Sequence, residues 1–169
     1  QVNFDLNESR DKNRAMLTVR AATTTVNWGK LDATGEDPDI NEEVTLLHNE
    51  NGLNFGTSYT SAKMKAVTET HERVIYTDTK TGTGAKSILY GHFQFKDAER
   101  TIGADEKSQD IWAGRSLVGN TTRENTLNIE DATTQSYRDA YGGWTAGTGT
   151  TAAAKFDSTN NTVNLKAGT

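Results

Sequence analysis

The 169-residue chain contains no cysteine, and this absence removes several classes of chemistry at once. Without thiols there is no disulfide, no Cys-x-x-Cys redox motif, no thiolate zinc site and no cysteine nucleophile. Proline is nearly absent too, with Pro38 alone. The length is enough for one sizeable core, so we expect a single domain, or a stretch of a longer repetitive one, over residues 1–169.

The chain also has no basic excess and no long apolar run, and its first residues do not show a signal-peptide pattern. Its formal net charge is −5, which gives no electrostatic footprint for nucleic acid. No run of about 18 apolar residues occurs and the mean hydropathy is −0.73, so we expect no transmembrane segment. Residues 1–4 lack the charged-then-apolar pattern of a signal peptide. This start predicts either a cytosolic protein or a trimmed segment of an exported one.

Helical periodicity is missing as well, and the residues that are abundant favour strands. Threonine is the commonest residue, and asparagine and glycine are frequent. Threonine suits pleated surfaces, whereas asparagine and glycine suit tight turns. Period-two or short apolar runs predict an all-β fold with strands at 3–6, 15–19, 23–29, 43–48, 72–79, 86–95, 110–114, 125–129, 139–144 and 161–165.

The texture of the sequence changes near residue 95. Residues 1–95 hold longer, more charged segments, and residues 96–169 alternate aromatic-glycine turns with Asn-Thr strands. No proline- or serine-rich linker separates the two parts. We therefore treat them as two regions of one segment.

The second region contains a repeat. "IWAGRSLVGNTTRENTLNIED" and "AYGGWTAGTGTTAAAKFDSTNNTVNLKAG" share an aromatic residue, a small residue, a glycine, a variable stretch and then Asn-Thr-apolar-Asn-apolar. The two Asn-Thr strands begin 161 − 125 = 36 positions apart. Fixed strands joined by variable loops are typical of stacked repeats, in which each unit buries its face against its neighbours.

Side-chain alternation predicts which repeat residues face inward. Asn125, Leu127 and Ile129 fall on one side of the first strand, and Asn161, Val163 and Leu165 on the same side of the second. If the apolar pairs point inward, the two asparagines do so too, and stacked rungs would satisfy them by a ladder of side-chain amides. The alternative is that both asparagines simply occupy the turn before each strand.

These repeats resemble a known family. "AYGGW...NNTVNL" and "WAGRSLVGN...NTLNI" are similar to the "YGG...NNTVNI" repeats in passenger regions of Gram-negative autotransporter adhesins. "VNFDLNESRDKNRAMLTV" and "NEEVTLLHNENGL" also resemble recurring passenger segments. The chain departs from the pattern where Ala113 replaces the first glycine of the pair.

The resemblance implies a right-handed parallel β-helix, or β-solenoid, exported through the outer membrane and displayed on the bacterial surface. It implies a non-enzymatic adhesin or self-associating passenger whose partners are host or bacterial surface molecules or other copies of itself. The absence of cysteine fits export of an unfolded chain. The alternatives are a repeat subunit of a surface fibre and a secreted β-helix enzyme acting on polysaccharide.

Motifs for other chemistry are weak. "KTGTGAKS" at 80–87 fails the phosphate-loop pattern and instead predicts a hairpin turn. The acidic stretch 35–43 lacks the spacing of a calcium loop, and His48, His71 and His92 show no metal-binding spacing, so we expect no metal and no cofactor.

Nothing in the sequence singles out a catalytic residue. Asp131 and Asp139, for example, would serve a glycosidase only if the fold brought them together, and no serine elbow is present. Exposed aromatic residues bring large contact area at low entropic cost. Trp112, Tyr141 and Trp144, together with Trp28, are therefore candidates for ligand binding, with packing between rungs as the alternative.

Overall fold

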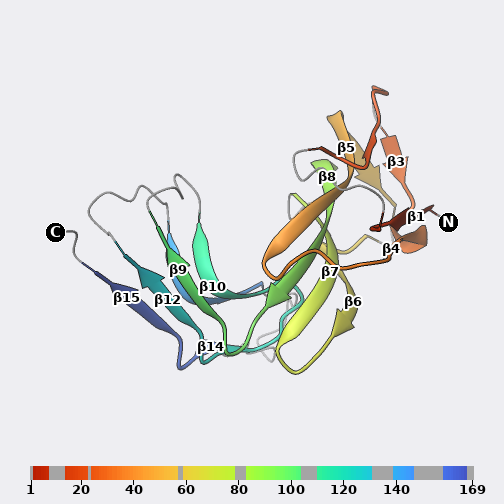
Figure 1. Ribbon diagram of the computed structural model, residues 1–169. Helices are drawn as coiled ribbons and strands as arrows, with labels where there is room; N and C mark the ends of the chain where they lie inside the picture. The colour runs from red at the N-terminus through yellow and green to blue at the C-terminus, as the bar shows by residue number, and fades with distance from the viewer. Residues whose placement is uncertain are drawn as a thin grey trace. The chain divides into compact units, whose positions relative to one another are not determined.

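The computed structural model describes residues 2–7, 14–22, 24–56, 59–78, 83–103, 110–130, 139–146 and 158–166. Over these residues the chain is built of β-strands, with one 3-10 turn, η1 (Trp28–Lys30), and no α-helix (Figure 1). The contacts divide it into two compact units. Unit 1 is Gln1–Ala66 with Arg73–His92, and unit 2 is Val67–Glu72 with Phe93–Thr169.

The strands of the first half lie mainly in unit 1. They are β1 (Val2–Asp5), β2 (Leu17–Thr18), β3 (Thr24–Val26), β4 (Leu31–Thr34), β5 (Glu42–Phe55), β6 (Ala62–Val67), β7 (His71–Thr77) and β8 (Thr83–Gln94). β1 pairs with β4 in parallel, and β2 and β3 both pair with β5 in parallel. β5 also pairs with β8, and this pair is antiparallel.

The hairpin predicted around residues 80–87 corresponds to β7 and β8, which are neighbours in the sheet. The turn itself, residues 79–82, lies outside the described residues. Beside it, the carboxylate of Asp78 accepts backbone bonds from Lys86 and Ser87. β8 pairs with β5 along one edge and runs antiparallel to it. The neighbour of β5 on that edge is therefore a hairpin strand and not a parallel coil.

Aliphatic and aromatic side chains from β1, β3, β4, β5, β7 and β8 form the core of unit 1. Trp28 is 2% exposed and makes ring contacts with Phe55 and Tyr59, at centroid distances of 5.4 and 5.5 Å. Its Nε1 donates to Thr60 Oγ1 at 3.2 Å. Trp28 is thus a core residue, which removes it from the candidates for ligand binding.

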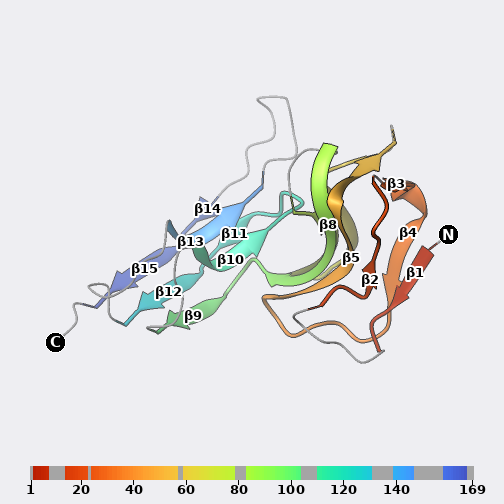
Figure 2. The same ribbon diagram turned by 90° about the horizontal axis from the view of Figure 1, so that it is seen from above.

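Unit 2 is a stack of parallel coils. Its strands are β9 (Glu99–Ile102), β10 (Ile111–Ser116), β11 (Thr122–Arg123), β12 (Thr126–Ile129), β13 (Ala140–Thr145), β14 (Ser158–Thr159) and β15 (Thr162–Leu165). Parallel pairs join β10 to β13, β11 to β14 and β12 to β15, and Figure 2 shows these neighbours side by side. β9 pairs with the other edge of β12. The predicted β-solenoid architecture is therefore confirmed.

Three successive coils can be defined from these pairings. The first coil contains Lys96, bridged to Arg123, and β9. The second contains β10, β11 and β12, and the third contains β13, β14 and β15. Ile102, Ile111, Ala113, Leu127 and Ile129 form the buried core between them. The core thus takes aliphatic side chains from β10 and from the paired strands β9 and β12.

Candidate functional site

The two repeat asparagines stand at the corner before each Asn-Thr strand and form a ladder. Asn125 is fully buried, and its Nδ2 donates to Asn161 Oδ1 at 2.7 Å. Asn125 Nδ2 also donates to the carbonyl of Phe95, and Asn125 Oδ1 accepts from the backbone N–H of Ala98. The turn and ladder readings therefore both describe these residues, because each asparagine lies in the corner and bonds to the coil before it.

The inward side chains of the two strands are in register but differ in exposure. Leu127 pairs with Val163 and Ile129 with Leu165. Leu127 and Ile129 are fully buried, whereas Val163 is 39% and Leu165 65% exposed. The predicted inward row therefore continues into the third coil, where Val163 and Leu165 are exposed to solvent.

The glycines of the aromatic-glycine motif make room for the ladder. A Cβ on Gly114 would lie 2.4 Å from the carboxamide carbon of Asn125, and one on Gly143 would lie 2.6 Å from Asn161 Nδ2. Contacts this short exclude any side chain while the asparagine is in position. The two halves of the repeat motif therefore depend on each other, because the glycine leaves the space that the asparagine side chain fills.

The same strands place aromatic residues and an arginine on the outer face of unit 2. In the parallel register Trp112 lies opposite Tyr141, and Arg115 lies opposite Trp144. The rings of Trp112 and Trp144 are 6.5 Å apart between centroids. All four side chains are partly exposed, and we call them the aromatic–arginine patch. The structure thus brings together the three predicted residues Trp112, Tyr141 and Trp144.

Arg115 lies among the rings of this patch. Its Cζ lies 4.1 Å from the Trp112 ring centroid, 5.7 Å from that of Trp144 and 4.7 Å from that of buried Phe93. These distances lie within the range of cation–π attraction. The patch therefore offers aromatic faces next to a fixed positive charge. Sequence reasoning missed Arg115, because nothing in "WAGRS" shows that it faces the same side as Trp112.

A buried carboxylate anchors the turn that follows the patch strand. Glu72 is fully buried; its Oε1 accepts from the backbone N–H of Leu117 at 2.6 Å, and its Oε2 accepts from Ser116 Oγ and Asn120 Nδ2, each at 2.7 Å. Burial raises the pKa of Glu72, and these three donors together with the charge of Arg115 oppose that rise. Glu72 therefore holds the end of β10 in place through a polar cluster that sequence analysis did not identify.

In unit 1 a serine, a histidine and a glutamate form a hydrogen-bonded chain. His48 Nδ1 lies 2.7 Å from Ser87 Oγ, and His48 Nε2 lies 3.0 Å from Glu50 Oε1. This connectivity resembles that of a nucleophile, a base and an orienting acid. However, Glu50 is 76% exposed, and the backbone N–H of Ser87 donates to Asp78 rather than standing ready for an oxyanion. The hydrogen bond between His48 and Ser87 therefore links strands β5 and β8.

We expect Ser87 to be inert toward a fluorophosphonate probe of serine nucleophiles, because no donor for an oxyanion is available at its own N–H. Intact-mass spectrometry after prolonged incubation should show no adduct, with a known serine hydrolase as the positive control. Labelling that disappears in both Ser87→Ala and His48→Ala would contradict this expectation and revive the enzyme alternative.

The acidic stretch 35–43 contributes an ion pair to unit 1. The carboxylate of Asp37 accepts a bond from Tyr90 Oη at 2.7 Å and pairs with Arg73. Burial works against ionisation of Asp37, but Tyr90 and Arg73 outweigh it and hold the pKa below its usual value. Within the described ranges no group of three or more His, Asp or Glu side chains is arranged to hold a metal ion. Asp131 lies outside the described residues.

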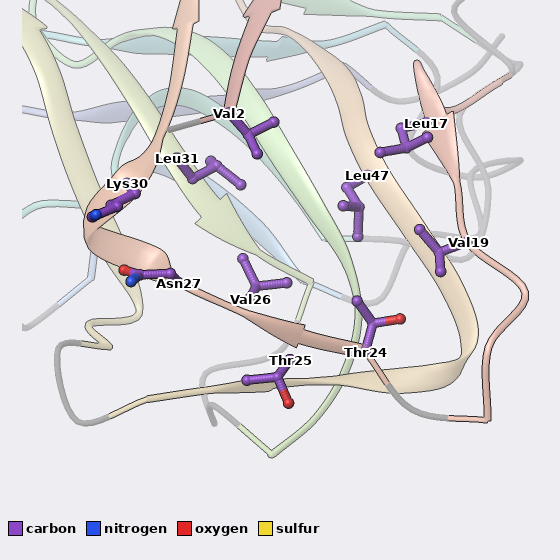
Figure 3. Close-up of a pocket in the computed structure, with 10 residues that line it drawn as sticks. All are labelled: Val2, Leu17, Val19, Thr24, Thr25, Val26, Asn27, Lys30, Leu31 and Leu47. Atoms are coloured by element: carbon purple, nitrogen blue, oxygen red, sulfur yellow. The ribbon is translucent and has the colours of Figure 1, made fainter.

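Unit 1 also has an open apolar cavity of about 310 Å³. Aliphatic side chains dominate its lining, and Figure 3 shows them converging from several strands, with Lys30 and Asn27 together at one margin. The full lining is Val2, Leu17, Val19, Thr24, Thr25, Val26, Asn27, Lys30, Leu31 and Leu47. Such a surface suits an uncharged apolar group. His48 follows Leu47 in β5 and so points to the opposite face, which separates this cavity from Ser87.

No protein-family model, curated protein or solved structure matches this chain. No helix in the part of the chain that the structure describes is long and apolar enough to cross a bilayer.

Proposed function

We propose that the chain is a non-enzymatic segment of a bacterial surface protein, of the autotransporter passenger kind, that acts in adhesion outside the cell. The resemblance of the "YGG...NNTVN" repeats supports this proposal, and stacked coils are compatible with it although many unrelated functions use such a fold. The observation that carries it is the aromatic–arginine patch, because it supplies binding chemistry on an outer face of the repeat.

The patch suits an acidic surface polysaccharide. Indole and phenol rings offer flat apolar area at low entropic cost, and aromatic and arginine side chains dominate the energy of many interfaces. A positive charge beside these rings favours a ligand that carries carboxylates. A sugar ring lying on Trp144 beside the charge of Arg115 would use both properties. The proposed ligand is therefore a glycan that carries carboxylates, on a host or bacterial surface.

The test is binding of the full chain to a panel of acidic and neutral polysaccharides. Trp144→Ala should weaken binding to acidic members by roughly ten-fold or more, because it removes a partly exposed aromatic contact. Trp144→Tyr should restore much of the affinity, since it keeps an aromatic face. Asn128→Ala, on the outer face of β12, is the matched control. Binding that Trp144→Ala leaves unchanged would argue against the patch as the ligand site.

Self-association is the second candidate function, and the exposed edge of the third coil favours it. Val163 and Leu165 leave apolar surface on β15. An unpaired strand edge with apolar side chains readily pairs with another chain. Sedimentation velocity over a hundred-fold range of concentration should then show growth of assemblies. A monomer at every concentration would rule out a self-assembling fibre.

A further inference from the structure

The outer edge of β15 has the geometry to pair with a further parallel strand. The three-stranded sheet runs in the order β15, β12, β9, so β15 is its last strand within the described residues. Each residue of β15 is exposed, although its register partners on β12 include the fully buried Leu127 and Ile129. The third coil thus carries the inward-facing pattern of the second, and among the described residues no strand pairs with the outer edge of β15.

The backbone N–H groups of the ladder donate in one direction along the stack. This direction predicts which donors and acceptors a further strand must have. The backbone N–H of Ala98 donates to Oδ1 of Asn125 at 2.9 Å, and the backbone N–H of Asn125 donates to Oδ1 of Asn161 at 3.1 Å. In each step one coil offers its backbone N–H and the following coil supplies the asparagine oxygen. By the same rule, the N–H of Asn161 is the donor for a further asparagine.

The amide nitrogens follow an equally regular rule. Asn125 Nδ2 donates to the carbonyl of Phe95 at 3.0 Å, and Asn161 Nδ2 donates to that of Thr122 at 3.1 Å. Each acceptor lies three positions before the ladder position of the preceding coil, since 98 − 95 = 3 and 125 − 122 = 3. The corresponding acceptor in the third coil is the carbonyl of Ser158, because 161 − 158 = 3.

The outer face of the sheet repeats a second row of asparagine. Asn164 Nδ2 donates to Asn128 Oδ1 at 2.8 Å, and Asn128 Nδ2 donates to Glu99 Oε1 at 3.2 Å. A further strand with asparagine three positions after its ladder asparagine would extend this row. The edge therefore specifies polar partners on both faces, with aliphatic residues between them.

We propose that the outer edge of β15 binds an extended peptide segment, in parallel, with the pattern Asn-Thr-aliphatic-Asn-aliphatic. The first asparagine accepts from Asn161 N–H and donates to the Ser158 carbonyl, and the two aliphatic residues cover Val163 and Leu165. This is strand addition to a sheet edge, in which backbone bonds give affinity and alternate side chains give specificity. The surface is distinct from the aromatic–arginine patch, so either proposal can fail while the other stands.

An antiparallel partner does not meet the same requirements. Two copies that joined β15 to β15 around a two-fold axis would run in opposite directions, and their asparagines would not lie over Asn161 and Ser158 in the ladder register. Such a dimer would bury Val163 and Leu165 without extending the ladder. Dependence on the ladder asparagine therefore separates the two modes.

The experiment uses a fluorescent peptide with the sequence of residues 158–166, STNNTVNLK, titrated against the full chain and followed by anisotropy. The matched control peptide, STNATVNLK, lacks only the ladder asparagine and should bind at least ten-fold more weakly. Leu165→Lys in the protein should weaken binding of the first peptide, and its unchanged circular dichroism would show that this exposed substitution leaves the fold intact. Amide hydrogen exchange at Asn161 should slow when the first peptide is present.

Equal binding of the two peptides, no binding of either, or unchanged exchange at Asn161 would each overturn the proposal. A chain that dimerises without peptide, and loses the dimer in Leu165→Lys, would show the antiparallel self-pairing instead. None of these outcomes bears on polysaccharide binding, which is measured with Trp144→Ala.

Discussion

Replacing Asn125 by alanine is expected to lower the free energy of unfolding by about 3–5 kcal/mol. The side chain is fully buried and bonds to Ala98, Phe95 and Asn161, so its loss leaves several buried polar groups without partners. Denaturant unfolding measures the change, and faster amide exchange at Ala98 should accompany it. Asn128→Ala, on the strand that follows Asn125 and facing outward, should cost less than about 1 kcal/mol.

The packing of Asn125 against Gly114 allows a second, coupled prediction. Gly114→Ala alone should destabilise the chain by about 1–3 kcal/mol, because its Cβ would overlap the Asn125 carboxamide. In Gly114→Ala with Asn125→Ala, the added methyl group meets a shortened side chain. The double variant should therefore be more stable than the sum of the two changes, by about 0.5–3 kcal/mol. Strict additivity would mean that the glycine is there for another reason.

The second large effect concerns the dependence of stability on pH through Glu72. Burial raises its pKa above the ordinary value of 4.5, so between 4.5 and the raised pKa the folded chain binds more protons than the unfolded chain. Stability contributed by this group therefore falls as pH rises through that window and is constant above it. Each unit of the pKa rise corresponds to about 1.4 kcal/mol.

Glu72→Gln should remove this slope. The free energy of unfolding of the unmodified chain minus that of Glu72→Gln should be larger at pH 4.5 than at pH 8, because only the carboxyl group gains from protonation. Denaturant unfolding at several pH values gives both curves. Glu99→Gln, which removes an exposed carboxylate from β9, is the matched control for the loss of charge. Parallel curves for the unmodified chain and Glu72→Gln would show that Glu72 ionises as freely folded as unfolded.

Much of the strand pattern could be predicted, because it depends on apolar alternation within the chain. β7, β10, β12, β13 and β15 lie within two residues of their expected bounds. β9 was missed because "ERTI" has a single buried residue, Ile102, and exists as a strand through its pairing with β12. β11 and β14 have two residues each, too few to show a period.

The candidate site was only partly predictable for a similar reason. The alignment of the two aromatic-glycine motifs places Trp112 opposite Tyr141, so their proximity follows from the sequence once coils are assumed. The choice between ladder and turn depends on a distance between residues 36 positions apart, which alternation cannot supply. Glu72 bonds to residues 44 to 48 positions away, and "HERV" gives no sign that its glutamate is buried.

The direction of the ladder has a consequence for the order in which unit 2 forms. Asn125 finds its partners on Phe95 and Ala98, and Asn161 finds one on Thr122, so each corner bonds to backbone that precedes it in the chain. A coil can satisfy its asparagine only after the earlier coil has formed. Repeat stacks grow by adding units to a neighbour that is already folded. Each later coil of unit 2 should therefore depend for its stability on the coil before it, and under force applied at the C-terminal end of the unit the third coil should be the first to detach.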